Sequence, residues 1–161
     1  MVSIPSLWLA IILSSVLVFI GSSVLHMVLT YHKHDFGQVP DEDAVMGALR
    51  PFGIPPGDYV MPYAGSSEVM QSPEYKQKTE DGPVAFMTIL APGAFSNMGA
   101  QLAQWFVYCV VVSVVTAYVA TRTMAAGADY LAVFRLVGTV AFACYAMSLP
   151  QRAIWYKQSW G

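Results

Sequence analysis

The chain has 161 residues, of which 56% are hydrophobic and only 11% are charged, and its mean hydropathy is +0.51. Soluble domains usually carry about 25% charged residues, so this composition excludes an ordinary water-soluble domain and indicates a membrane protein. Basic residues, 8 in number, are outnumbered by 10 acidic residues, which argues against a nucleic-acid-binding protein.

The first predicted element is a transmembrane helix within residues 1–29. Residues 7–29 contain no charged side chain, and about 20 helical residues suffice to cross the hydrocarbon core of a bilayer. The segment must be helical there, because lipid offers no partners to backbone polar groups. A cleaved signal peptide is the alternative, but the start of the chain lacks Lys and Arg and its apolar run is too long. We therefore expect a retained helix.

Residues 30–99 form a polar insert that holds eight of the ten prolines and nine of the ten acidic residues. Such a segment is too long for a simple connection, and it predicts an ordered extramembrane lobe of short elements. Gly57 in the PPGDY motif is expected to supply a positive φ in a turn. The apolar residues 84–90 are too short to cross a membrane, and they fit a strand, a buried segment or an interfacial stretch.

Two short helices are expected within this lobe. Asp41 is suited to cap the first helix, which should end before Pro51. Ser72 is suited to begin the second helix, and Gly82 is suited to end it.

A helical hairpin is predicted for residues 100–149. Its two apolar runs, 102–120 and 130–149, are joined by a connection so short that the helices must be antiparallel neighbours. Both cysteines, Cys109 and Cys144, lie inside these runs, so no disulfide framework is expected. Residues 150–161 mix basic and aromatic side chains, as in an interfacial belt. The fold class that follows is an all-α integral membrane protein with three transmembrane helices and an ordered extramembrane lobe between the first two.

The expected orientation follows from the positive charges near the spans. Lys33, Arg152 and Lys157 lie on one side, whereas Arg122 and the α-amino group lie on the other. The positive-inside rule then places the N-terminus outside and the lobe in the cytoplasm. The expected location is the bacterial cytoplasmic membrane.

Histidines are the first candidates for a cofactor site. His26 is the only histidine in the three apolar runs, and an intramembrane histidine can ligate haem or a chlorin magnesium, or relay protons. Ser22, one turn earlier, would let a flat macrocycle approach. A hydrogen-bonded interfacial histidine is the alternative. The HKHD motif at 32–35 offers two imidazoles and a carboxylate, but zinc requires three or four convergent ligands, so no metal site and no cofactor are predicted.

No catalytic constellation is recognised, so the chain is not expected to be an enzyme. The carboxylates of residues 41–43 fit the first turn of a helix, where the helix dipole favours them. Ser66 and Ser67 lack the spacing of a nucleophile elbow. Neither a phosphate-binding loop nor a dinucleotide fingerprint is present.

The most suggestive pattern is a ridge of small side chains at successive i+4 positions on the second apolar run, and we call it the small-residue ridge. Such ridges let helices approach closely in lipid. We expect the third run to meet the ridge with Gly138 and Ala141. The contact either stays within the hairpin or serves docking on a different protein. The ridge consists of Cys109, Ser113, Ala117 and Thr121.

Four sequence stretches also prompt a comparison: PPGDYVMPY at 55–63, GPVAFMTI at 82–89, NMGAQLAQWFVY at 97–108 and PQRAIWYKQSW at 150–160. Together they resemble a family of small bacterial polytopic membrane proteins that has no established activity. The resemblance therefore implies the membrane location but no functional residue. It also implies a further apolar span after the IWY…W stretch, which would place both termini on one side.

These observations favour a non-catalytic accessory subunit that docks on a larger bacterial membrane complex, of which respiratory and photosynthetic assemblies are the natural class. The expected partners are that complex and lipids. The alternative is a homo-oligomer that binds or transports a quinone, a lipid or another apolar small molecule. A pigment or haem protein that uses His26 is a third hypothesis.

Overall fold

The computed structural model describes residues 2–29 and 35–160 of a chain that is mostly helical and contains one small sheet. The chain divides into two compact units. The first unit combines residues 1–37 with 98–161, and the second comprises residues 38–97. From here on, the insert means residues 38–97. Each unit is described by itself below.

Three helices of the first unit are long and apolar enough to cross a membrane: Ile4–Val28, Gly99–Thr123 and Tyr130–Tyr156. The first begins with a 3-10 turn, η1 (Ile4–Leu7), continues as α1 (Trp8–Ser23) and ends in a π-helical turn, η2 (Val24–Val28). The second is α5 (Gly99–Thr123), and the third is α6 (Tyr130–Ala146), which α7 (Leu149–Tyr156) extends. The expected apolar runs therefore form helices that are slightly longer than predicted.

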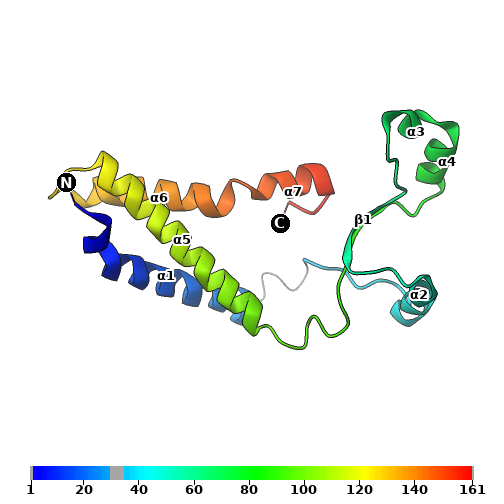
Figure 1. Ribbon diagram of the computed structural model, residues 1–161, viewed down its shortest axis with the longest axis horizontal. Coiled ribbons are helices and arrows are strands. Elements are labelled where there is room, and N and C mark those ends of the chain that lie inside the picture. The colour runs from blue at the N-terminus through cyan, green and yellow to red at the C-terminus, as the bar shows by residue number, and fades with distance from the viewer. Residues whose placement is uncertain (1, 30–34, 161) are drawn as a thin grey trace. The chain divides into compact units, whose positions relative to one another are not determined.

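The helix α5 packs against both α1 and α6 (Figure 1). Phe19 of α1 meets Phe106 of α5 edge to face, with ring centroids 5.6 Å apart. On the other side, the Tyr108 hydroxyl donates to the Cys144 carbonyl of α6 over 2.8 Å. The short connection between α5 and α6 makes them neighbours, as predicted.

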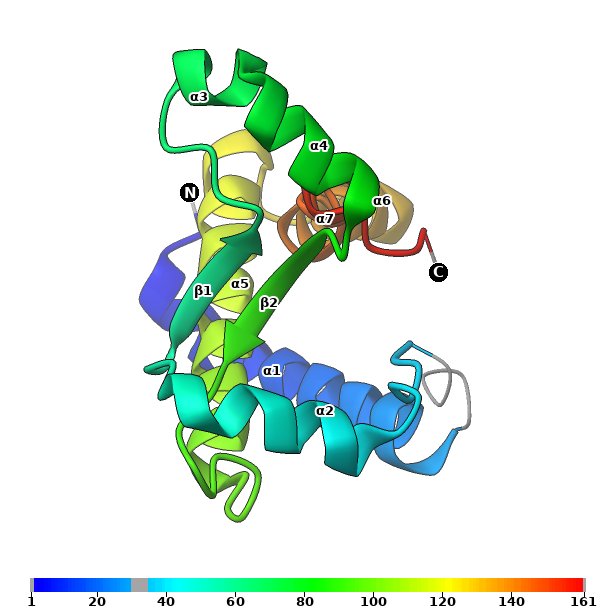
Figure 2. The ribbon, with the colours of Figure 1, turned by 90° about the vertical axis from the view of Figure 1, so that its right-hand side faces the viewer.

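The insert contains four helical pieces and two strands, and Figure 2 labels α2, α3, α4, β1 and β2. The strands β1 and β2 are antiparallel, with Gly57 opposite Ile89 and Met61 opposite Ala85. The elements in chain order are α2 (Glu42–Leu49), η4 (Arg50–Phe52), β1 (Gly57–Met61), α3 (Ser67–Gln71), α4 (Pro73–Asp81) and β2 (Ala85–Ile89).

The all-α expectation is wrong for the insert, because β1 and β2 form a two-stranded sheet. The segment 84–90 contains strand β2, so the first of its three interpretations, a strand, is confirmed. Residues 62–84, with two helices, separate the paired strands, so a local hydrophobic pattern cannot reveal the pairing. Between the strands, the Thr88 hydroxyl donates to the Asp58 carboxylate over 2.6 Å.

The residues predicted to begin and end the second short helix of the insert are confirmed at α4. The Ser72 hydroxyl accepts from the Tyr75 amide over 3.2 Å, and Gly82 ends the helix with φ of 64°. The helix α2 begins after Asp41 as expected, but the Asp41 side chain makes no capping hydrogen bond.

The turn expectation for Gly57 is wrong. Gly57 begins strand β1, and the positive φ falls earlier in the chain, at Gly53 with φ of 56°. The physical reason is strand pairing, because Gly57 lies opposite Ile89 in the β1–β2 ladder, and a paired strand residue has extended backbone with negative φ.

Candidate functional site

Three serines form a polar contact between the first two spans, and we call them the serine cluster. The hydroxyl oxygens of Ser14 and Ser15 on α1 each lie 3.1 Å from the Ser113 oxygen on α5. Ser14 and Ser15 are also 3.0 and 2.7 Å from the Ile11 carbonyl, which accepts from both. Each hydroxyl has one proton to donate, so Ser113 donates in turn to one of its two neighbours. The cluster lies near the middle of two 25-residue helices that are long and apolar enough to cross a membrane.

The small-residue ridge is covered within the chain. Cys109 is fully buried, and Ala117 and Thr121 are only 8% and 7% exposed. Ser113 faces α1 through the serine cluster, and Thr121 lines a pocket together with Ile4 of the first span. At Ser113 and Thr121 the ridge thus meets the first span, which the sequence pattern did not indicate, whereas Cys109 lies beside Tyr145 of α6.

Gly138 does not meet the ridge. It is exposed, and a Cβ built on it would have no atom within 4 Å. The α5–α6 pair contacts instead through large side chains, since Tyr108 and Tyr145 meet edge to face with centroids 5.6 Å apart. Gly138 lies on a face of α6 that no described part of the chain covers, so it makes no contact with the ridge. A role of Gly138 in packing against another chain stays a prediction.

An aromatic cluster joins all three long helices near the N-terminal end of α5. The Trp105 indole nitrogen donates to the Ser22 hydroxyl over 2.8 Å, and Ser22 donates to the Phe19 carbonyl over 2.9 Å. The Trp105 ring stacks on Tyr108 at 5.6 Å and lies 6.0 Å from Tyr145. Since Trp105 is apolar apart from one N–H, it can bury its ring and satisfy that donor at once.

His26 lies in the π-helical turn η2, and its Nδ1 is 2.8 Å from the Ser22 carbonyl. A carbonyl only accepts, so Nδ1 carries the proton. The Trp105 indole lies against Ser22, at the position where a flat macrocycle would have to approach the helix. This geometry favours the hydrogen-bonded interfacial histidine over a pigment ligand.

The remaining candidates have structural roles where they are described. Ser66 caps α3, because its hydroxyl accepts from the Val69 amide over 3.3 Å. Glu42 and Asp43 lie in the first turn of α2. In the described parts of the chain, no three His, Cys, Asp or Glu side chains gather to hold a metal ion. Of the HKHD motif, residues 32–34 lie outside the described residues.

Sequence reasoning missed the contribution of α1 to this site. Ser14, Ser15 and Ser22 supply the polar contacts to α5. The signal was present, because SSVLVFIGSS repeats a serine pair after eight residues, and residues two helical turns apart share a face. Small hydroxyl side chains in an apolar helix mark the face that packs.

Compared with family models, with curated proteins and with solved structures, the chain matches none of them.

Proposed function

We propose that the chain is a non-catalytic accessory subunit that crosses the bacterial cytoplasmic membrane and docks on a larger membrane complex. The observation that carries this proposal is the insert: among residues 38–97, all of which the structure describes, no residue is buried. A soluble domain of about 60 residues normally buries about 60% of its unfolded surface. A partner that covers the insert would supply the burial that it lacks.

The insert offers such a partner large apolar side chains. Phe52, Tyr63 and Phe95 are 75%, 77% and 85% exposed. On α2, a face formed by Val45, Met46 and Leu49 is exposed as well. Aromatic and Met side chains are enriched in the cores of protein interfaces. The docking surface that we propose therefore includes the α2 face.

Charge indicates the chemistry of the partner surface. Residues 38–97 contain eight acidic and three basic side chains. A net negative lobe is attracted by a basic surface and repelled by an acidic one. We therefore propose a partner that presents basic side chains around an apolar patch.

The third span is a second candidate contact. The apolar window of the Tyr130–Tyr156 helix has 0% of its residues buried, against 11% and 17% for the other two spans. The small-residue ridge is already covered within the chain, so α6 is better placed than the ridge to meet another membrane protein. We keep respiratory and photosynthetic assemblies as the host class, with the lobe in the cytoplasm.

The test is isolation of the tagged chain from its own organism in mild detergent, followed by size separation and mass spectrometry. Co-migration with a large complex at fixed stoichiometry supports the proposal. The double substitution Met46→Glu with Leu49→Glu should release the chain from that complex. Gly47→Glu is the matched control, because Gly47 lies on the opposite side of α2 and a Cβ there meets no atom within 4 Å.

Migration of the chain alone would contradict the proposal. The alternative is a homo-oligomer that holds a quinone, lipid or other apolar molecule between its copies, and the exposed α6 surface fits a second copy as well as a different protein. A homo-oligomeric mass with a retained small molecule would favour this alternative.

A further inference from the structure

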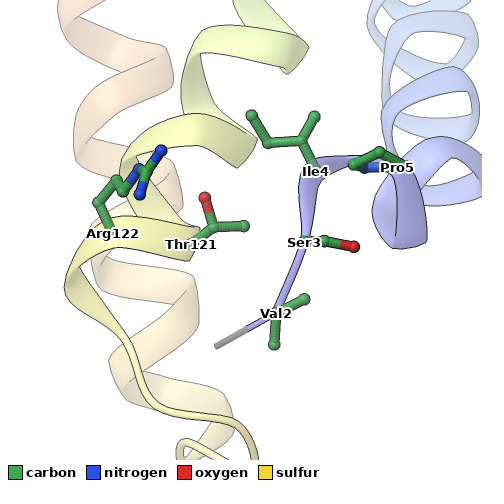
Figure 3. A pocket seen from close by; sticks show the side chains of 6 residues that line it. All are labelled: Val2, Ser3, Ile4, Pro5, Thr121 and Arg122. Carbon is green, nitrogen blue, oxygen red and sulfur yellow. The ribbon is translucent and has the colours of Figure 1, made fainter.

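A pocket of about 300 Å³ opens where the first span begins and α5 ends. Figure 3 shows the N-terminal segment on one side and the last turn of α5 on the other. Both helices end here, so the pocket lies at the depth of lipid headgroups if the helices cross the membrane. Its lining residues are Val2, Ser3, Ile4, Pro5, Thr121 and Arg122.

The lining combines one cation with an apolar wall. Arg122 contributes a guanidinium whose planar donors match the oxygens of a phosphate group. The guanidinium carbon lies 5.4 Å from the Tyr118 ring centroid, so a cation–π contact helps to orient it. Val2, Ile4 and Pro5 supply apolar surface beside it. A ligand that fits both parts carries a phosphate next to a hydrocarbon portion.

The charged residues around the pocket indicate whether the headgroup is anionic or zwitterionic. No carboxylate is among the residues that line the pocket. Asp129, the acidic residue in the α5–α6 connection, accepts from the Leu131 amide over 2.9 Å and caps α6. A zwitterionic headgroup would bring an ammonium group without an anionic partner, whereas an anionic headgroup needs none.

We propose that this pocket binds the headgroup of an anionic phospholipid, with the phosphate on Arg122 and the glycerol and first acyl carbons against Val2, Ile4 and Pro5. The inference rests on the proposed crossing of the membrane by the three helices. It does not depend on docking on a host complex.

Lipid binding to the purified full-length chain tests the proposal, with native mass spectrometry in the presence of phosphatidylglycerol or phosphatidylcholine. Phosphatidylglycerol should bind more tightly. Arg122→Gln should weaken that binding about tenfold or more, since charge-assisted hydrogen bonds are among the strong ones. Arg135→Gln, which removes the same charge from an exposed position on α6, should bind as the unchanged chain does. Val2→Trp, which fills the pocket but keeps Arg122, should also lose binding.

Equal affinity for the two lipids, or equal losses in Arg122→Gln and Arg135→Gln, would overturn the proposal. Displacement of phosphatidylglycerol by millimolar inorganic phosphate would do the same, because it would assign the pocket to a free anion. Extraction of the chain from its native membranes by alkaline carbonate is a separate measurement. Release there would refute membrane crossing, and the accessory-subunit proposal with it, whereas retention together with unselective lipid binding would overturn this inference alone.

Discussion

Tyr108 and Tyr145 share one aromatic cluster, but their hydroxyls have different surroundings. The Tyr108 hydroxyl donates to the Cys144 carbonyl, whereas the Tyr145 oxygen is buried without a well-formed hydrogen bond among the described residues, and the Cys109 thiol, a weak hydrogen-bonding group, lies beside it. A buried hydroxyl without a partner costs about 1–3 kcal/mol, and a made hydrogen bond contributes about 0.5–1.5 kcal/mol. Two substitutions of the same kind should therefore have opposite effects on stability.

We predict that Tyr145→Phe leaves the free energy of unfolding unchanged or raises it by about 1 kcal/mol, because it removes a buried oxygen that has no well-formed hydrogen bond. Tyr108→Phe should lower it by about 0.5–1.5 kcal/mol. Unfolding in mixed micelles of mild detergent and dodecyl sulfate, followed by circular dichroism, measures both. A lower stability of Tyr145→Phe would show that this hydroxyl has a partner after all.

The serine cluster gives a second prediction at this scale. Ser113→Ala should lower the free energy of unfolding by about 0.6–2 kcal/mol, the range measured for hydrogen bonds between membrane helices. Ser113→Leu should cost more, because the larger side chain also separates α1 from α5. Val111→Leu is the control, since Val111 is 51% exposed on the same helix. If Ser113→Ala is as stable as the unchanged chain, the three hydroxyls contribute nothing to packing.

Because the small-residue ridge is covered within the chain, substitutions on it would not test docking on a partner. Ser113→Leu with Ala117→Leu would have tested docking if the ridge faced a partner protein. Ala117 is buried and Ser113 contacts α1, so this double substitution disrupts the chain itself. A loss of co-purification in that variant says nothing about the docking surface, which is why the α2 variants are the better test.

At the scale of elements, α5 and α6 differ in burial, and this difference determines whether a substitution changes the stability of the isolated chain. The helix α5 contributes five buried residues, whereas α6 contributes none. Substitutions on the outer surface of α6 should therefore leave the isolated chain intact and change only its association with lipid or with other chains.

Gly138→Ala tests this expectation. A Cβ at this position meets no atom within 4 Å, and alanine is the better helix former, so the stability of the isolated chain should not fall. Unfolding in micelles, as above, provides the measurement. If the same variant detaches the chain from a host complex, Gly138 belongs to an external helix contact, as its sequence context predicts. Destabilisation of the isolated chain would instead contradict the described position of α6.

The three long apolar helices, α2 and α4 were predictable from sequence, because each has a cause within a short window: an apolar run with at most one charged side chain for the long helices, and Ser72, Pro73 and Gly82 for α4. The short helix α3 was not predicted. Nor were the sheet and the α1–α5 contact. Their causes are pairs of residues far apart in the chain, such as Asp58 with Thr88 and Ser15 with Ser113. A local pattern specifies that a face packs, but not which element covers it.

For the whole molecule, the absence of buried residues in 38–97 has a direct thermodynamic meaning. Hydrophobic burial is the main term that offsets the conformational entropy of folding, and a two-stranded sheet alone is marginal in water. The strands, short helices and caps of the insert cannot supply this term by themselves.

We predict that a peptide of residues 38–97 shows no cooperative unfolding. Urea titration followed by circular dichroism and tyrosine fluorescence should give a gradual change without a sigmoidal transition. A second titration after addition of the isolated host complex should show a transition, because binding to the folded form stabilises it. A sigmoidal curve from the peptide alone would contradict this account of the insert.

The same unburied insert has a consequence for the amount of this protein in a cell. If the chain docks as we propose, a copy that is not assembled exposes the insert and its aromatic side chains to proteases, which degrade unfolded segments continuously. Its lifetime would then depend on how many host complexes are free to accept it. Synthesis in excess would not produce an accumulated pool, and deletion of the host would remove the protein without any change in its messenger RNA. The copy number of the chain would follow that of its partner through selective turnover.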